Sequence, residues 1–265
     1  MKIDNPFTSA QVHFDNVSVH YQPRPTWLGG KPFKALSGLN LKISTNNLAV
    51  VGPSGAGKST LIELLFGLRK PTHGEVYVCG YPLSTLTKQQ RQKLCKHIQL
   101  VPQEPHTSLN PYYTIRQLLT EPLINLGFGG DYEQRLLKVT ADVGLHDSVL
   151  DLFPRQLSVG QAQRIAIARA LVVEPCVLVA DEPTSALDPI NRQCILELIS
   201  RLQQQRDMLL ILVTHDLAAA KVLCDEILVL DKGEVVENRS TREVMQNPLH
   251  PTSQALLNAQ SLITA

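Results

Sequence analysis

Apolar and polar residues alternate near the start of the chain, and this period of two is typical of strands with one buried face. The apolar positions of the alternation are Val12, Phe14, Val17, Val19 and Tyr21. Residues 177–180 and 208–213 are apolar throughout, which predicts parallel strands that are buried on both faces. A shorter apolar run at 48–51 and a strand-like run at 98–101 predict two more strands.

Apolar residues at helical spacing predict helices between and after these runs. Leu61, Leu64, Leu65 and Leu68 predict one face of a helix that follows residues 52–59. Ser158 is a typical N-cap residue, and the apolar face of the helix after it comprises Ile165, Ala168, Leu171 and Val172. Another helix is expected over 190–205, and residues 226–237 predict a hairpin with a helical tail after it.

A strand, a glycine-rich loop and a helix in succession make one half of a βαβ unit, so the chain is predicted to be an α/β protein. Residues 104–156 are richer in polar residues, contain four prolines and show helical spacing. We expect them to form a largely helical insertion. Residues 22–34 are rich in proline and glycine and predict a loop.

The overall composition excludes several classes of protein. The 25 Lys and Arg residues nearly balance the 24 Asp and Glu residues, whereas a nucleic-acid-binding domain is usually strongly basic. The five cysteines contain no CxxC pair, which favours reduced thiols over disulfides or a zinc site. No apolar stretch approaches the roughly 18 residues of a membrane span. We therefore expect a cytosolic protein that serves a membrane, if at all, from outside it.

The segment 52–59 has the P-loop pattern GxxxxGK[ST]. Glycines allow backbone N–H groups to curl around phosphates at the positive end of a helix. Lys58 is expected to reach the β- and γ-phosphates of a nucleotide, and the hydroxyl of Ser59 to ligate Mg²⁺. The alternative, a glycine-rich turn that binds nothing, is disfavoured by the strand before the loop and the helix after it.

Two acidic residues, Asp181 and Glu182, end the apolar run at 177–180. One carboxylate at the end of a strand can hold the Mg²⁺ that bridges the phosphates. The next can orient a water molecule and remove its proton for attack on the γ-phosphate. A solvated acidic turn is the alternative, and the presence of a P-loop makes it the weaker one.

Four further features follow, and three of them have ordinary explanations when each is taken alone. Ser158 with the free N–H groups of its helix makes a second anion site, or simply an N-cap. The segment 185–188 follows the acidic pair directly. His215 comes directly after a buried strand and is either a γ-phosphate contact or a packed core histidine. Gln103 is either a site residue or a surface amide. Their order and spacing together favour the functional explanations.

Taken together, these motifs resemble those of the ATP-binding cassette (ABC) transporter ATPases, over most of the chain. The resemblance implies a P-loop NTPase (RecA-like) core sheet with an N-terminal antiparallel β subdomain and an inserted helical subdomain. It divides the single domain of 1–265 into a nucleotide-binding core at about 1–103 and 157–240, a helical part at 104–156 and a tail at 241–265.

The resemblance also assigns a role to each motif. Walker A comprises Gly52, Pro53, Ser54, Gly55, Ala56, Gly57, Lys58 and Ser59, with Thr60 next to it. The signature comprises Leu157, Ser158, Val159, Gly160 and Gln161, and the D-loop comprises Ser185, Ala186, Leu187 and Asp188. Glu182 is implied as the catalytic base, with Gln103 of the Q-loop and His215 of the switch. The resemblance implies Ser59, Gln103 and Asp181 as ligands of Mg²⁺. It also implies that Tyr21 stacks on the adenine of ATP; the alternative is that Tyr21 is a core residue at the end of a strand.

The family's arrangement implies that the P-loop of one ATPase subunit faces the signature helix of another, with two ATP molecules between them. Closure on ATP and opening after hydrolysis would then drive transport. Val159 departs from the glycine that is usual at this signature position. This departure leaves open that the signature serves the weaker of two unequal sites.

Two segments indicate the branch of the family. Residues 103–111 resemble a QxPxxSLNP segment, and residues 247–257 resemble an NPxHPYTxxLL segment, both typical of peptide and nickel importers. The loop around Trp27 also resembles an insertion in these ATPases. No cysteine follows Cys224, so no C-terminal iron–sulfur site is expected.

The expected protein is therefore an ATPase subunit that couples hydrolysis to uptake of short peptides, nickel or metal chelates. Its partners would be a second ATPase, often non-identical, two membrane permeases and a separate solute-binding protein. The permeases are expected to dock near the Q-loop and 104–125. The chain would lie peripherally on the cytoplasmic face of the inner membrane and bind no nucleic acid.

Three alternatives belong to other classes. A DNA-repair ATPase would carry a long coiled coil between Gln103 and Leu157, and a ribosomal one would carry two cassettes. Neither feature is present in the sequence. A P-loop kinase has no use for the signature or for His215. An ATPase that serves an exporter stays open.

Overall fold

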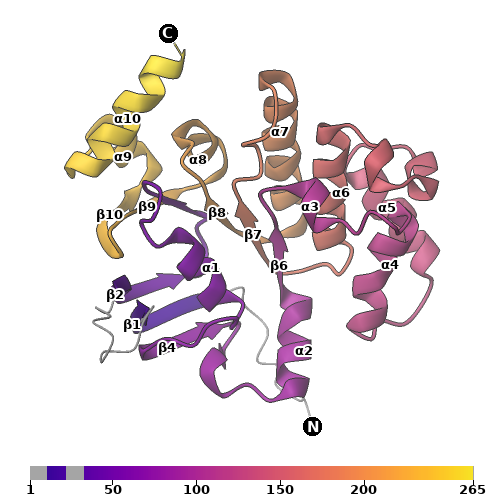
Figure 1. Ribbon diagram of the computed structural model, residues 1–265, viewed down its shortest axis with the longest axis horizontal. Coiled ribbons are helices and arrows are strands. Elements are labelled where there is room, and N and C mark those ends of the chain that lie inside the picture. Colours follow the sequence, from indigo (N-terminus) through magenta and orange to yellow (C-terminus); the bar gives the residue numbers. More distant parts are fainter. Residues whose placement is uncertain (1–10, 22–32, 265) are drawn as a thin grey trace, which may run out of the picture. The chain divides into compact units, whose positions relative to one another are not determined.

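The computed structural model describes residues 11–21 and 33–264, which form two compact units. The first unit is drawn from residues 1–88 and 211–265, and the second comprises residues 89–210. Figure 1 follows the chain from indigo to yellow. The expected loop around Trp27 lies outside the described residues.

In the first unit, an antiparallel sheet has the strand order β2-β1-β4-β5. Its strands are β1 (Val12–Tyr21), β2 (Phe33–Ile43), β4 (His73–Val78) and β5 (Tyr81–Pro82). Four of the apolar positions that alternate along β1 are buried: Val12, Phe14, Val17 and Val19. The predicted N-terminal antiparallel β subdomain is confirmed, because the period-two pattern places one face of β1 in the core.

The first unit also contains a mixed set of strands in the order β10-β9-β3-β8. They are β3 (Leu48–Val51), β8 (Leu209–Val213, within this unit from Ile211), β9 (Glu226–Asp231) and β10 (Glu234–Ser240). β3 runs parallel to both β8 and β9, and β9 forms an antiparallel hairpin with β10. The hairpin turns at Lys232 and Gly233, as the sequence predicts.

Helix α1 (Lys58–Leu65) is shorter than its apolar pattern predicts. Leu61, Leu64 and Leu65 are buried as expected, but Leu68 is 76% exposed. Gly67 has a φ of +60° just before it, a left-handed conformation that ends helices. Placing Leu68 on the buried helical face was therefore wrong, because the chain leaves the helix before reaching it.

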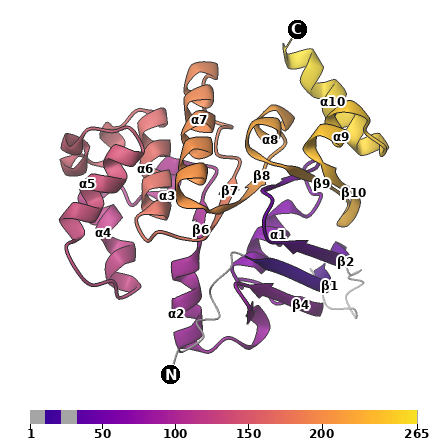
Figure 2. The same ribbon diagram turned by 180° about the vertical axis from the view of Figure 1, so that it is seen from behind.

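The second unit pairs β6 (Ile98–Val101) in parallel with β7 (Val177–Asp181). Its helices are α2 (Lys88–His97), α3 (Pro105–Ser108), α4 (Ile115–Asn125), α5 (Tyr132–Asp142), α6 (Val159–Leu171) and α7 (Pro189–Arg206). Figures 1 and 2 show α3, α4 and α5 gathered against α6. The predicted apolar face of the α6 segment, from Ile165 to Val172, is buried.

Residues 104–156 contain α3, α4 and α5 together with the short 3-10 helices η3 (Asp147–Asp151) and η4 (Pro154–Gln156). The core, helical and tail divisions of the single domain stay a prediction. Within 11–21 and 33–264, no helix is both long and apolar enough to cross a membrane.

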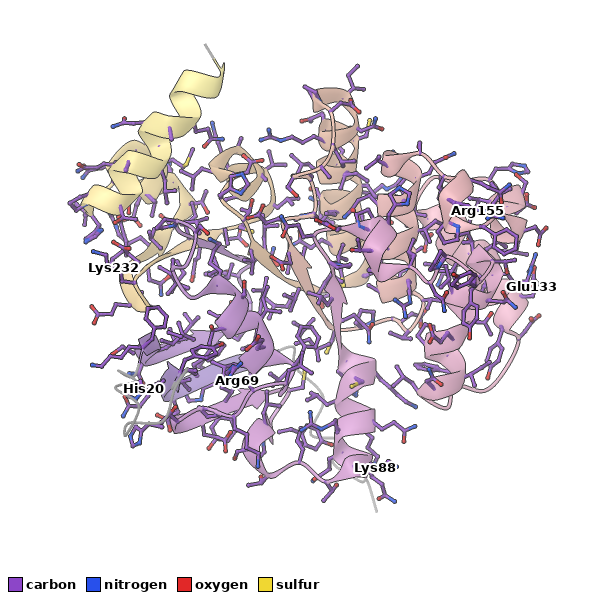
Figure 3. All side chains as sticks on the ribbon, in the orientation of Figure 1. His20, Arg69, Lys88, Glu133, Arg155 and Lys232 are labelled. Carbon is purple, nitrogen blue, oxygen red and sulfur yellow. The ribbon has the colours of Figure 1, made fainter. Side chains whose placement is uncertain are left out.

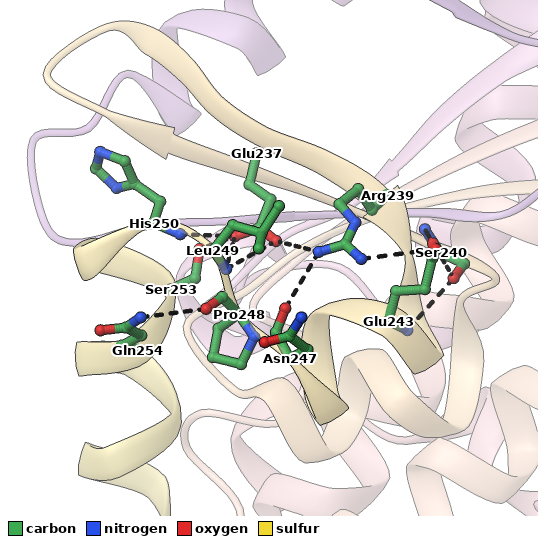
Figure 4. Close-up of polar contacts among 10 residues, drawn as sticks. All are labelled: Glu237, Arg239, Ser240, Glu243, Asn247, Pro248, Leu249, His250, Ser253 and Gln254. Carbon is green, nitrogen blue, oxygen red and sulfur yellow. Dashed lines mark hydrogen bonds and ion pairs between the residues drawn. The ribbon is translucent and has the colours of Figure 1, made fainter.

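A buried carboxylate, drawn in Figure 4, helps to attach the tail of the first unit. The Glu237 side chain on β10 is only 2% exposed. It accepts hydrogen bonds from the backbone N–H groups of Leu249 and His250 and from Ser253 Oγ at 2.6 Å, and Arg239 pairs with it at 3.2 Å. These bonds join β10 to the turn between α9 (Thr241–Gln246) and α10 (Pro251–Thr264).

Burial alone raises the pKa of Glu237, but the hydrogen bonds from Ser253, Leu249, His250 and Arg239 together outweigh it and leave the pKa below its ordinary value. A carboxylate whose folded pKa is lowered contributes stability above the unfolded pKa of about 4.3. That contribution is lost as the pH falls through the folded pKa.

Glu237→Ala should therefore destabilise the chain, because it leaves several buried donors unpaired. The expected loss is on the order of 3 kcal/mol, or roughly 5–10 °C in Tm. Thermal unfolding at neutral pH measures it, and Glu234→Gln at an exposed position of the same strand is the matched control. The difference from wild type should shrink below about pH 4. Equal Tm values for Glu237→Ala and wild type at neutral pH would contradict this role.

Candidate functional site

The glycine-rich segment joins β3 to α1 within the first unit. All four residues of β3 are buried, and Gly57 is the N-cap of α1 with a φ of +109°. A Cβ at Gly57 would lie 2.6 Å from the carbonyl oxygen of Ala35, so only glycine fits there. Ser59 is exposed in the first turn of α1, where helical N–H groups have no partner within the helix.

The loop holds its own lysine in place. Lys58 Nζ donates to the carbonyl oxygens of Gly52 at 2.7 Å and Pro53 at 2.9 Å. Pro53, Ser54 and Gly55 are exposed, whereas Ala56 and Thr60 are buried. The loop therefore exposes residues 53–55 above buried residues and keeps the half-buried lysine against its own backbone. This arrangement suits a bound polyphosphate.

Tyr21 is the last residue of β1 and is half-buried. Its hydroxyl lies 3.3 Å from Thr60 Oγ1 and donates to Glu63 Oε2 at 3.3 Å. The guanidinium carbon of Arg69 lies 4.2 Å from the centroid of its ring. The ring is thus held at one edge by α1 and on one face by a cation.

His215 follows β8 and is exposed, which excludes the packed core histidine. The next residue, Asp216, is the N-cap of α8 (Leu217–Leu223) and accepts hydrogen bonds from the N–H groups of Ala218 and Ala219. Gln260 on α10 donates to the same carboxylate at 3.1 Å. The segment that carries His215 is therefore fixed from both α8 and α10.

In the second unit, the acidic pair lies at the end of β7. Asp181 is the last residue of the strand, and both Asp181 and Glu182 are half-buried. Glu182 has a φ of +43°, which is uncommon for a residue with a side chain. The N–H and hydroxyl of Ser185 both donate to the Glu182 carbonyl, so the turn is tied back on itself. Strained residues of this kind occur preferentially at functional sites.

Gln103 lies two residues beyond β6 and is exposed. It has no role in the core, and an exposed amide at the end of a parallel strand can bind a ligand. Parallel strands place their functional residues at their carboxyl ends. β6 and β7 are parallel neighbours, so Gln103 and Asp181 both lie at the carboxyl end of this pair.

The signature segment forms the start of α6, as predicted. Ser158 is the N-cap and accepts from the N–H of Gln161 at 3.2 Å, while Gln161 Oε1 accepts from the N–H of Ser158 at 3.0 Å. This reciprocal capping box fixes the first turn. Leu157 is buried beneath it, whereas Val159 is 42% exposed. Val159 therefore lies on the surface of the segment and not in its packing.

The D-loop leads into α7, whose N-cap is Asp188. Ser185 and Ala186 are exposed and Leu187 is half-buried. Asp188 Oδ1 accepts from the N–H groups of Ile190 and Asn191, and Oδ2 accepts from the side chain of Asn191 at 2.5 Å. The hydrogen bonds from the side chain and backbone of Asn191 are the largest factors that hold the pKa of Asp188 below its ordinary value.

Asn191 also contacts the signature helix. A Cβ at Gly160 would lie 2.8 Å from Asn191 Oδ1 and 3.1 Å from its Cγ. The signature and the D-loop are therefore packed against each other within the second unit, through a glycine and an anchored amide. Sequence reasoning did not find Asn191, because an Asn in the first turn of a helix has no distinguishing pattern.

Comparison with known proteins places these motifs in a family. The family described as ABC transporter matches residues 36–185. The dipeptide transport ATP-binding protein DppF of Haemophilus influenzae is 39% identical over 244 residues, 90% of this chain and 75% of that protein. The oligopeptide transport ATP-binding protein OppF of Salmonella typhimurium is 37% identical over 253 residues, 94% of this chain and 75% of that protein.

Solved structures agree with the sequence relatives. A dimeric post-hydrolysis state of the ATP-binding cassette MJ0796, bound to ADP and Pi, has a TM-score of 0.77 and 32% identity, covering 87% of this chain and 99% of that one. The predicted α/β P-loop NTPase fold is confirmed by this likeness.

The contact between Gly160 and Asn191 predicts a coupling between two substitutions. Gly160→Ala should push the Asn191 amide off Asp188, which costs on the order of 1 kcal/mol. In an Asn191→Ala background the added methyl meets no obstacle, and alanine is the better helix former. Gly160→Ala should then be neutral or stabilising. Thermal or denaturant unfolding of the two single variants and the double variant gives the coupling. Equal effects of Gly160→Ala in both backgrounds would show that the contact carries no energy.

Proposed function

Because the chain belongs to the ABC transporter family, we propose that it is the ATP-hydrolysing subunit of an importer for short peptides. The observation that carries the proposal is the presence of two exposed helix starts suited to phosphate. One follows Gly57 on α1 and the other follows Ser158 on α6. The relatives named above are named for dipeptide and oligopeptide transport, which favours peptides over nickel or metal chelates as cargo.

ATP is bound, in this proposal, through its phosphates at the loop formed by residues 52–60. Backbone N–H groups at the start of α1 and the ammonium group of Lys58 face the phosphate oxygens, and Tyr21 stacks on adenine. The exposed Pro53, Ser54 and Gly55 leave the loop open to the ligand. The Tyr21 ring is already held in place, so it needs little ordering on binding.

Mg²⁺ fits the residues that are expected to hold it. Ser59 offers an exposed hydroxyl, Asp181 a half-buried carboxylate and Gln103 an exposed amide oxygen. All three are the hard oxygen donors that Mg²⁺ prefers alongside phosphate oxygens. When bound, the ion would neutralise charge on the β- and γ-phosphates.

Glu182 is the proposed base that takes a proton from the attacking water. Glu182 adopts a left-handed backbone conformation directly after β7, and two hydrogen bonds from Ser185 to its carbonyl oxygen hold this turn. His215 and Gln103 are the proposed γ-phosphate contacts, since both are exposed two residues beyond the end of a strand. The D-loop, residues 185–188, connects this turn to the contact between Asn191 and Gly160.

The second phosphate-binding helix start, residues 157–161, serves the ATP of a partner. The proposed complex contains a second ATPase subunit, either a non-identical paralogue or another copy of this chain. The dimeric state of the cassette named above supports this arrangement. Val159 is exposed at the start of the signature helix. If it weakens ATP binding at the partner's site, the two sites of the complex are unequal.

The remaining partners follow from the proposed transport role. They are two transmembrane permeases and a periplasmic or lipid-anchored solute-binding protein, with no nucleic acid. The chain acts peripherally, at the cytoplasmic face of the inner membrane. Exposed Tyr112, Tyr113 and Ile124 in the region expected to dock the permeases are consistent with an interface there. Peptide uptake by vesicles that carry the complex distinguishes this importer from an exporter or a non-transport ATPase.

Glu182→Gln should abolish turnover and leave ATP bound, because the amide preserves size but cannot take a proton. The expected loss in kcat is about 10²–10⁴-fold, with little change in ATP affinity. Phosphate release and nucleotide binding measure the two quantities. Glu174→Gln, a second positive-φ glutamate of the same unit, is the control and should keep wild-type turnover. A Glu182→Gln variant that hydrolyses ATP normally removes Glu182 as the base.

Hydrolysis should also depend on a second ATPase subunit, because each site takes its signature helix from the partner. The specific activity should fall as the chain is diluted or separated from its partner, and it should return on reconstitution. A dilution series with sedimentation in parallel measures this dependence. Full activity of dilute monomer contradicts the shared site.

A further inference from the structure

Arg69 lies just beyond α1, in the loop that leads to β4, and its side chain turns back over Tyr21. The backbone N–H of Arg69 donates to the Glu63 carbonyl at 3.2 Å, which folds the chain toward the helix. Its side-chain Nε then donates to Glu63 Oε2 at 2.5 Å. In this position the guanidinium carbon lies 4.2 Å from the centroid of the Tyr21 ring. Figure 3 labels Arg69 beside the sheet formed by β1 and β4.

The same carboxylate holds both members of the pair. Glu63 Oε2 accepts from the Tyr21 hydroxyl at 3.3 Å and from Arg69 at 2.5 Å. Glu63 also raises the pKa of Arg69, chiefly through this hydrogen bond, with burial opposing it. The Tyr21 hydroxyl lies 3.3 Å from Thr60 Oγ1 as well, which is 7% exposed in the first turn of α1. The tyrosine ring is therefore fixed at its edge and on one face.

We propose that Arg69 is a positioning residue for the nucleotide base: it covers one face of Tyr21 and leaves the opposite face as the platform for adenine. This inference rests on the proposed function and adds a determinant of base recognition to it. A guanidinium over a phenol ring is attracted by the ring's negative face. It also fixes the plane of the ring, so that the base finds its platform already ordered.

The contact with Thr60 gives this arrangement a second consequence. Thr60 directly follows Ser59, so the bond from Tyr21 joins the base platform to the phosphate loop. The spacing between the base platform and the phosphate loop is thereby set by the end of β1 and the start of α1. Loss of Arg69 should disturb recognition of the base and leave recognition of the phosphates intact.

The test compares ligands with and without a base. Binding of ATP and of inorganic tripolyphosphate, both with Mg²⁺, is measured by titration calorimetry on the full-length chain. Arg69→Ala should raise the Kd for ATP about 3- to 5-fold, the strength expected of an exposed cation–π contact, and leave tripolyphosphate unchanged. Arg69→Lys keeps the charge but loses the planar group, so its Kd for ATP should lie between those of wild type and Arg69→Ala. Arg242→Ala, at an exposed arginine of α9, is the matched control and should bind both ligands as wild type does.

A double-variant cycle with Tyr21 adds a readout that general destabilisation does not move. In a Tyr21→Ala background the platform is gone, so Arg69→Ala should change the Kd for ATP by less than about 1.5-fold. In the assembled transporter, Arg69→Ala should raise KM for ATP and leave kcat unchanged, because the base makes no contact with the reacting phosphate.

Three results would overturn the inference. Unchanged or tighter ATP binding by Arg69→Ala would mean that the guanidinium does not support the base or occupies its place. Equal weakening for tripolyphosphate would mean that the effect is not on the base. An undiminished effect of Arg69→Ala in the Tyr21→Ala background would mean that it does not act through the ring. Failure of the wild-type chain to bind either ligand is a different result, since that contradicts the proposed function itself.

Discussion

The need to leave backbone N–H groups uncovered at two helix starts governs much of this structure. At α1 the requirement is met by Gly57, whose left-handed conformation and close approach to Ala35 exclude any side chain. At α6 it is met by Ser158 and Gln161, which satisfy each other's backbone and leave Val159 between them exposed. Each helix start needs a firm base to hold its N–H groups in place. The buried strand β3 supports α1, and the buried Leu157 supports α6.

Much of the fold and part of the site could be predicted from the sequence because they depend on local patterns. Strand β1 follows from alternation, β7 and β8 follow from continuous apolar runs, and the cap of α6 follows from the chemistry of Ser158. The P-loop is a special case, since its glycines are required by backbone geometry that no other residue can adopt. In each of these places, a few neighbouring residues decide the conformation.

The parts that could not be predicted depend on contacts between distant segments. The pairing of Asn191 with Gly160 joins residues 31 positions apart, and nothing near either residue indicates it. Arg69 and Tyr21 are likewise brought together only when α1 packs against the N-terminal strands. Leu68 shows the opposite failure, because an apolar residue at the right spacing was carried out of the helix by the left-handed Gly67. A periodic pattern contains no information about where the backbone turns.

The bonds of Lys58 to the carbonyl oxygens of Gly52 and Pro53 bear on how tightly a phosphate can be held. A ligand that draws the ammonium group toward itself exchanges these contacts for new ones, so affinity at this loop is a difference between two sets of bonds. The carbonyl oxygens that the lysine leaves behind must then be rehydrated. The loop therefore favours ligands with enough negative charge to draw the Lys58 ammonium group away from its own backbone carbonyls, and it selects among anions by their charge density.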